Sequence, residues 1–283
     1  MGKSETALEI AKSFNAEIVN GDAFQIYKEM NIGVAKPPME YFSIIKHHLF
    51  SFVDIDHNYS IAEYQKDVRK TINEILSRGK NVVIVGGSGL YIRSALYDYE
   101  FTEQPVINME KYESLTNEEL YEELEKIDPK QAQIIHMNNR KRVLRAIEIY
   151  LAEGKTKSEV IESQEHKLIY DAKFFVRNMN RDTLYSLIDK RVDKMVEQGL
   201  FNEVKDIFVK HGKGCNALQA IGYKELIPVI EGKRSLEEGI ELVKKNSRNY
   251  AKRQTTFIRH QFPVTFYENT QDLLGILRKW MII

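Results

Sequence analysis

Short apolar runs alternate along the chain with longer stretches whose apolar residues recur at helical spacing. The apolar runs lie at residues 18–19, 81–85 and 172–176. Continuous runs of this kind are typical of parallel strands buried on both faces, whereas the stretches between them predict helices. The alternation predicts an α/β protein with a parallel sheet, in which ligands bind just beyond the carboxyl ends of the strands.

Residues 60–79 carry the most complete helix signals of the chain. Ser60 followed by Glu63 predicts a capping box, and Gly79 fits the position just after the helix. The apolar stripe of this helix comprises Ile61, Tyr64, Val68, Ile72, Ile75 and Leu76. The same spacing predicts further helices over residues 136–151, 181–200 and 236–259.

Two predicted strand ends carry residues suited to chemistry. Asp22 follows the run that stops at Asn20–Gly21, and Gly86–Gly87–Ser88 follows the run at 81–85. Asp22 is either a group that acts on a ligand at the sheet edge or the N-cap of a following helix. The glycine-rich turn either offers its N–H groups and the Ser88 hydroxyl to a ligand or serves turn geometry alone.

Composition argues against a protein with membrane-spanning helices and against one that depends on disulfides or cysteine-bound zinc. The chain has 283 residues, of which 43% are hydrophobic and 29% charged, as in soluble globular proteins. No apolar run approaches the roughly 18 residues that a membrane-spanning helix needs. Cys215 is the only cysteine, which excludes an intrachain disulfide and a cysteine-based zinc site. A free thiol suits a reducing compartment, so we expect a cytoplasmic protein without a membrane partner.

The net charge of zero conceals an uneven distribution of charged residues. Residues 100–128 hold ten acidic side chains and two basic ones, residues 140–157 hold six basic and two acidic ones, and residues 244–260 hold six Lys or Arg and no acid. Local basic patches govern contacts with phosphates. In the last stretch, the row Lys244, Arg248 and Lys252 and the interleaved aromatic residues either suit single-stranded nucleic acid or belong partly to the core.

The acidic stretch also indicates how the chain is divided. Short amphipathic segments at residues 115–127 and 129–135 predict a helical insertion. We therefore expect a first part of the α/β core at residues 1–100, the insertion at residues 101–137, and a second part of the core at residues 138–283 that includes a basic helix.

The first residues match the end of a phosphate-binding loop. Gly2-Lys3-Ser4, followed by a helical stretch, corresponds to the last three residues of G-x-x-x-x-G-K-[ST]. In such a loop Lys3 supplies a point charge to a phosphate, and the Ser4 hydroxyl binds Mg²⁺. The sequence lacks the first glycine of the motif and the strand before it. We expect either that it begins inside the loop or that the loop does not work.

Ten segments, in order, resemble the bacterial tRNA dimethylallyltransferase family, also called tRNA isopentenyltransferase. They are MGKSETALEIA, NGDAFQIY, NIGVAKP, HHL, YSIAEY, VGGSGLYI, NNRKRVLRAIEIY, RVDKMVEQGLFNEV, QAIGYKEL and YAKRQTTF. The resemblance implies a P-loop NTPase-like parallel sheet flanked by helices, with a mostly helical insertion domain. It also implies transfer of a dimethylallyl group from its diphosphate to the N6 amine of the adenosine immediately 3′ of the tRNA anticodon.

The resemblance assigns roles to individual residues. Asp22 matches the general base, and Gln25 matches its adenine-reading neighbour. The groups implied to bind diphosphate are Gly2, Lys3, Ser4 and Arg191; of these, Ser4 also binds Mg²⁺, and Ser4 and Arg191 count as catalytic with Asp22. The positions implied to contact tRNA are Asp22, Ala23, Phe24, Gln25, Ser88, Lys141, Arg142, Val143, Leu144, Arg145, Lys252, Arg253, Gln254 and Arg259. The implied partners are dimethylallyl diphosphate and the tRNA anticodon stem-loop, and we expect a monomer.

The chain departs from the usual pattern of the family at several positions. Ala23 stands where relatives usually have Ser, Val34 and Ser88 stand where they have Thr, and Met137 stands where they have Pro. The insertion is also short. Of these departures, the short insertion bears on tRNA binding, and the substitutions have little bearing on the expected function.

Two other functions stay open at the level of sequence. A P-loop kinase would use Gly2, Lys3 and Ser4 with Asp54 as a metal-binding carboxylate, and would leave the basic helix near the C-terminus unexplained. A non-catalytic tRNA-binding protein would use the basic patches alone, with binding that weakens as salt increases.

Overall fold

The computed structural model describes residues 2–101 and 107–281. Met1 of the predicted phosphate loop and residues 102–106 of the predicted insertion lie outside the described residues. The chain forms two compact units, one from residues 1–96 and 170–283 and the other from residues 97–169. We name the first the core unit and the second the insertion unit.

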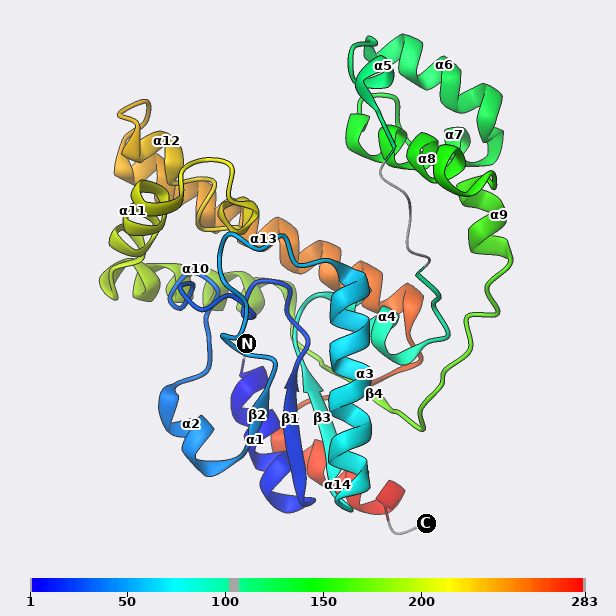
Figure 1. The fold of residues 1–283 in the computed structure, drawn as a ribbon. Helices are drawn as coiled ribbons and strands as arrows, with labels where there is room; N and C mark the ends of the chain where they lie inside the picture. The colour runs from blue at the N-terminus through cyan, green and yellow to red at the C-terminus, as the bar shows by residue number, and fades with distance from the viewer. Residues whose placement is uncertain (1, 102–106, 282–283) are drawn as a thin grey trace. The chain divides into compact units, whose positions relative to one another are not determined.

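Two parallel sheets lie in the core unit (Figure 1), one with the strand order β2-β1-β3 and one that pairs β4 with β5. The strands are β1 Ala16–Asn20, β2 His47–His48, β3 Asn81–Val85, β4 Phe174–Arg177 and β5 Val264–Tyr267. β1 pairs with β3 along its whole length, from Ala16 opposite Asn81 to Asn20 opposite Val85. The predicted strands are confirmed, the last of them at Phe174–Arg177.

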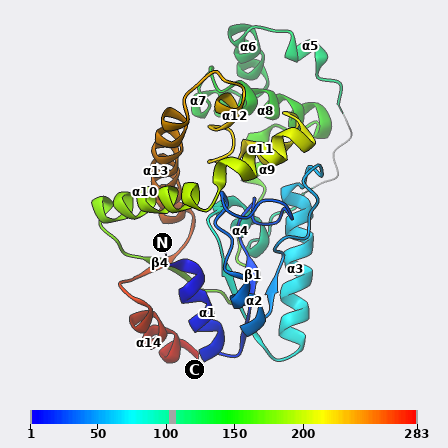
Figure 2. The same ribbon diagram turned by 90° about the vertical axis from the view of Figure 1, so that its left-hand side faces the viewer.

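Helices cover both faces of the first sheet. The core-unit helices are α1 Lys3–Ser13, α2 Met39–Ile44, α3 Ile61–Ser77, α4 Gly89–Leu96, α10 Arg181–Glu197, α11 Leu200–His211, α12 Ile227–Ile230, α13 Leu236–Gln261 and α14 Thr270–Met281, with a 3₁₀ turn at Asn216–Gln219. Figure 2 shows β1 between α1 and α3. None of the described helices has both the length and the apolar composition needed to cross a membrane.

Helix α3 shows how local signals set the boundaries of an element. The Ser60 side chain accepts a hydrogen bond from the backbone N–H of Glu63, whose own side chain accepts from the Ser60 N–H, so the predicted capping box is present. Gly79 has a φ of +68°, a left-handed conformation that glycine adopts without strain. The predicted stripe is buried apart from Ile61, which is half-buried, and Leu76, which is 47% exposed.

The single sheet expected from the sequence is divided in two. β3 and β4 both line an apolar cavity of about 470 Å³, to which Lys3 and Gly86 also contribute. Among the described strands, β3 and β4 are not paired with each other. The cavity thus separates two parallel sheets within one unit.

The insertion unit is helical and begins and ends at residues other than those predicted. Its helices are α5 Glu110–Glu113, α6 Asn117–Ile127, α7 Pro129–Ile134, α8 Arg140–Glu153 and α9 Lys157–Glu162. Val143 and Ile147 of α8 share one buried cluster with Leu120 and Leu124 of α6. Because α8 buries its apolar face there, the unit extends to residue 169, and the boundary expected at residue 137 is corrected.

Helix α13 is joined to α10 by charge pairs. The Nζ of Lys244 lies 2.8 Å from an Asp193 carboxylate oxygen, and the Arg248 guanidinium pairs with Asp189. Two of the three cations in the basic row predicted on α13 therefore already have protein partners, and Lys252 is the exposed one.

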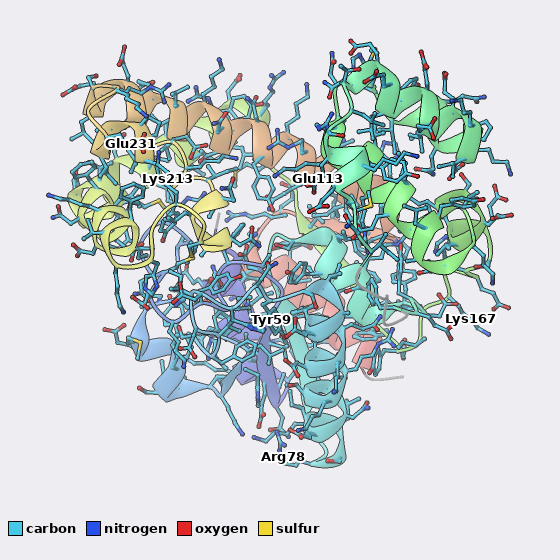
Figure 3. All side chains as sticks on the ribbon, turned by 45° about the horizontal axis from the view of Figure 1, so that its top comes forward. Tyr59, Arg78, Glu113, Lys167, Lys213 and Glu231 are labelled. Atoms are coloured by element: carbon cyan, nitrogen blue, oxygen red, sulfur yellow. The ribbon has the colours of Figure 1, made fainter. Side chains whose placement is uncertain are left out.

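A buried carboxylate joins β1 to the end of α3. The Glu17 side chain is 4% exposed and accepts hydrogen bonds from His48 at 2.6 Å, Arg78 at 2.6 Å and Lys80 at 2.9 Å. Burial alone would raise its pKa, but the bonds from Lys80 and His48 and the charges of Lys80 and Arg78 outweigh burial and lower the pKa of Glu17 to about 2. In Figure 3, Arg78 lies at the opposite end of α3 from Tyr59.

Replacing Glu17 with Gln is expected to lower the free energy of unfolding by about 1–3 kcal/mol, because three donors lose a charged acceptor while Arg78 and Lys80 can turn to solvent. The folded pKa of Glu17, about 2, lies below its ordinary 4.5, so its contribution is complete above pH 4.5 and disappears as the pH falls toward 2. Urea unfolding measured between pH 7 and pH 3 checks both statements. Glu74→Gln, on the exposed face of α3, is the matched control.

Candidate active site

The carboxyl ends of β1 and β3 touch each other. A Cβ on Gly86 would lie 2.0 Å from the carbonyl carbon and oxygen of Gly21, so only glycine fits there. The Gly21 N–H donates to the Val85 carbonyl at 2.8 Å, and the Ser88 N–H donates to the Gly21 carbonyl at 3.1 Å. The glycine-rich turn therefore serves backbone geometry, and that geometry holds the residues after both strands together.

Asp22 lies two residues beyond β1 and is held by Asn20. The Asn20 side chain accepts from the Asp22 N–H at 2.9 Å and donates to the Asp22 carbonyl at 3.0 Å. One carboxylate oxygen of Asp22, Oδ1, accepts from the Phe24 N–H at 3.0 Å, which closes a local turn. No helix begins before α2 at Met39 within this described segment, so the helix-cap interpretation of Asp22 is wrong.

Two cations lie within electrostatic reach of Asp22. Lys3, in the first turn of α1, also donates to the Gly86 carbonyl at 3.1 Å, and Arg191 comes from α10. Both residues are exposed. Loss of hydration lowers the pKa of each, Asp22 raises both values, and Arg191 lowers that of Lys3. The site thus collects two cations and one carboxylate from three distant segments.

Tyrosines that sequence reasoning did not assign to the site surround Asp22. Burial is the main cause that raises the pKa of Tyr91, to about 12, and of Tyr64 and Tyr250, and the Asp22 charge raises each further. The Tyr64 hydroxyl donates to the Asn20 carbonyl at 2.8 Å. These phenols therefore stay protonated at neutral pH. Periodicity had identified Tyr64 only as a core residue, and no local signal marks the three as neighbours.

Ser88, Tyr250 and Gln254 form a polar network over the turn. The Ala23 N–H donates to the Ser88 hydroxyl at 3.0 Å, and the Gln254 side chain donates to the Gly87 carbonyl at 2.7 Å. The Tyr250 hydroxyl is hydrogen-bonded to the side chains of Ser88 and Gln254. Gln254 and Ser88, both predicted to contact tRNA, thus also fix the backbone around Asp22.

Three predicted tRNA-contact residues on α13 are exposed. These are Lys252, Arg253 and Arg259. The Arg253 guanidinium lies 5.8 Å from the Tyr250 ring centroid and that of Arg259 lies 5.3 Å from the Phe266 ring. Each guanidinium thus lies within cation–π distance of an aromatic ring.

The predicted tRNA-contact residues on α8 do not all face solvent. Lys141, Arg142 and Arg145 are exposed, and Arg145 also pairs with Glu148 at 2.6 Å. Val143 is fully buried and Leu144 packs against the same cluster. The side chain of Val143 therefore cannot contact RNA, and this part of the prediction is corrected, because alternate faces of one helix were taken as a single contact segment.

Ser4, the predicted magnesium ligand, lies at the start of α1. Ser4 offers a hydroxyl in the first turn, beside Lys3. The described residues contain no group of three or more His, Cys, Asp or Glu side chains able to enclose a metal. Mg²⁺ usually takes few protein ligands and completes its shell with phosphate oxygens and water, so a single hydroxyl ligand is compatible with it, and magnesium binding at Ser4 stays a prediction.

Asp54 does not support the kinase alternative. Its carboxylate forms an exposed ion pair with Lys28 at 2.7 Å, and its side chain is 77% exposed. Asp54 is thus paired with Lys28 on the surface and does not supply the metal-binding carboxylate that a kinase needs. Arg177, which sequence reasoning did not single out, lies instead beside Gly2: its guanidinium would be 3.2 Å from a Cβ at that position.

Sequence comparison agrees with this arrangement. The family described as IPP transferase matches residues 25–261. The tRNA dimethylallyltransferase of Anoxybacillus flavithermus is 44% identical over 276 residues, which cover 97% of this chain and 89% of that protein.

Solved structures have the same fold. The tRNA delta(2)-isopentenylpyrophosphate transferase from Staphylococcus epidermidis has a TM-score of 0.73 at 40% identity and covers 99% of this chain and 95% of its own. A eukaryotic dimethylallyltransferase acting on tRNA has a TM-score of 0.81 at 29% identity and covers 95% of this chain and 72% of its own. The predicted α/β class with helix-flanked parallel strands is confirmed. Since the family match spans most of the chain and the relatives align along nearly all of it, the chain belongs to the IPP transferase family.

Proposed function

We propose that this protein transfers a dimethylallyl group from dimethylallyl diphosphate to the N6 amine of the adenosine immediately 3′ of the tRNA anticodon. The observation that carries the proposal is that the Asp22 carboxylate lies just beyond the end of β1, within electrostatic reach of the cations Lys3 and Arg191. A base and an anion-binding pair are the two requirements of an alkyl transfer that expels diphosphate.

Asp22 acts on the nucleophile. The adenine amine is a poor nucleophile because its lone pair is delocalised into the ring. As the bond from N6 to the allylic carbon forms, the carboxylate accepts an N6 proton, an assistance typically worth about 10²–10⁴-fold in rate. Because Oδ1 is engaged by the Phe24 N–H, Oδ2 is the oxygen proposed to take the proton.

Lys3, Arg191 and the start of α1 act on the leaving group. As the carbon–oxygen bond breaks, its electron pair passes to diphosphate, and positive charge develops on the allylic carbon. Lys3, Arg191 and the N-terminus of α1 stabilise the negative charge that develops on the diphosphate oxygens. Mg²⁺ bound at Ser4 would supply further charge neutralisation on the same oxygens.

The polymer is held by the exposed cations. The adenine has to leave its stack to reach a site at the sheet edge, which costs a few kcal/mol. Contacts from Lys252, Arg253 and Arg259, and from Lys141, Arg142 and Arg145, would offset that cost. We propose that the enzyme works as a monomer in the cytoplasm, where its tRNA substrate resides.

Incubation with ¹⁴C-labelled dimethylallyl diphosphate, Mg²⁺ and an anticodon stem-loop RNA tests the proposal. Label is expected in the RNA that has adenosine at the target position and not in the matched RNA that has guanosine there. Salt-dependent RNA binding without label transfer would favour the non-catalytic alternative. Transfer of ³²P from ATP to a small molecule, without prenyl transfer, would favour the kinase.

A further inference from the structure

The Glu203 side chain of α11 accepts hydrogen bonds from three consecutive backbone N–H groups of a loop far away in the sequence. Its carboxylate accepts from the N–H groups of Asn31 at 2.9 Å, Ile32 at 2.9 Å and Gly33 at 3.0 Å. The Tyr223 hydroxyl donates to the same carboxylate at 2.5 Å. Three successive amides of a loop have few other ways to satisfy their hydrogen bonds, so this carboxylate determines the path of the loop.

The surroundings of Glu203 leave the loop little freedom. Tyr223 is fully buried, and a Cβ on Gly33 would lie 2.4 Å from its ring. Burial and the Glu203 charge raise the pKa of Tyr223, so its hydroxyl remains a donor. Lys36 closes the loop from the other side by donating to the Tyr27 carbonyl at 2.5 Å and to the Asn31 side chain at 3.2 Å.

The carbonyl groups of this loop hold the side chain of Gln25. The Gln25 amide nitrogen donates to the carbonyls of Val34 at 2.9 Å and Ala35 at 3.1 Å. Only the NH₂ end of a glutamine amide can face two carbonyl oxygens, so these contacts fix which way the amide is turned. The atom left for a ligand is its carbonyl oxygen, which is an acceptor.

We propose that Glu203 is a positioning residue that, through residues 31–35, presents the Gln25 carbonyl oxygen as the acceptor for the amino group of a 6-aminopurine. This inference rests on the proposed function, and it names how adenine is distinguished from a 6-oxopurine. The oxygen of a 6-oxopurine would face the Gln25 carbonyl oxygen, and two acceptors cannot form a hydrogen bond with each other. Glu203 does not touch the substrate; it acts through the loop and Gln25.

A double-mutant cycle tests the proposal. Glu203→Gln keeps the shape of the side chain but turns a donor toward the loop amides, and it is expected to lower kcat/KM for the stem-loop about 10–100-fold. The KM for dimethylallyl diphosphate should stay within two-fold. In a Gln25→Ala background, Glu203→Gln should lower kcat/KM by less than two-fold more, because the group it positions is already absent. If the fold losses in kcat/KM of the two single variants multiplied in full in the double variant, the proposal would be overturned.

Two companion variants separate positioning from general damage to the fold. Tyr223→Phe removes one of the four donors and should give a smaller loss in the same direction. Asp206→Asn changes an exposed carboxylate on the same helix and should leave kcat/KM unchanged. If Asp206→Asn lowers kcat/KM as much as Glu203→Gln, the positioning role is overturned.

A spectroscopic measurement on the free protein does not depend on the reaction. The side-chain NH₂ signals of Gln25, assigned as those lost in Gln25→Ala, should be sharp in the wild type and shifted or broadened in Glu203→Gln. Unchanged Gln25 signals would overturn the positioning role. A wild type without prenyl transfer would contradict the proposed function while the Gln25 signals still test the contact, so the two failures are distinguishable.

Discussion

Replacing Asp22 with Asn is expected to lower kcat for prenyl transfer by about 10²–10⁴-fold, the usual contribution of a positioned general base. Asn keeps an Oδ1 that can accept from the Phe24 N–H and therefore preserves the turn after β1. What it loses is the negative charge that accepts the N6 proton. Single-turnover transfer of label to the stem-loop measures the loss.

The asparagine variant should still bind both substrates, because its shape is unchanged. Stem-loop affinity by fluorescence anisotropy is expected within three-fold of wild type. Asp182→Asn, an exposed carboxylate in the first turn of α10, serves as the matched control and should be fully active. An Asp22→Asn enzyme that kept more than half of the wild-type rate would remove the base assignment.

The sequence predicts well those features that depend on residues within one segment, such as helix caps and apolar strands. The helix over α3 was predicted with its cap and its end because Ser60, Glu63 and Gly79 act on neighbouring backbone groups. β3 was predicted because an almost continuous apolar run is typical of a parallel strand, although Asn81 is exposed and residues 82–85 are only half-buried. The position of Asp22 just past β1 followed from the end of such a run.

Contacts between distant segments lie outside what such patterns contain. Glu203 binds a loop about 170 residues earlier, and nothing near Glu203 in the sequence indicates it. The same holds for Tyr250 above Ser88. Lys244 and Arg248, two cations of a row predicted to suit nucleic acid, pair with Asp193 and Asp189 instead, because a cation on a helix face is the same in sequence whether it meets solvent or a carboxylate.

The boundary of the insertion unit went wrong for a related reason. The sequence prediction assigned α8 to the second part of the core at residues 138–283, whereas its apolar face packs against α6. Periodicity reveals that a helix has a face to bury but not which partner covers it. The roles proposed for Asp22 and Arg191 came from resemblance to a family and not from any pattern of residues.

Replacing Arg191 with Gln is expected to lower kcat/KM for dimethylallyl diphosphate about 10²–10³-fold, the typical cost of removing one donor to a developing oxyanion. Inhibition by free diphosphate should weaken as well, because the product carries the same charge. Arg191→Lys restores the charge without the planar two-pronged donor and should recover only part of the loss. Steady-state kinetics with varied dimethylallyl diphosphate, and diphosphate as inhibitor, measures both effects.

The pH profile gives Arg191 a second signature. Loss of hydration lowers the pKa of Lys3 below its ordinary 10.5, the Asp22 charge raises it, and the neighbouring Arg191 charge lowers it. Activity that needs protonated Lys3 therefore declines at high pH, and removing Arg191 should move that decline to higher pH even as the maximum rate falls. Lys190→Gln, the adjacent exposed cation on α10, should change neither the rate nor the profile. If Lys190→Gln and Arg191→Gln behaved alike, the effect would be one of general surface charge, and the contact of Arg191 with the leaving group would be refuted.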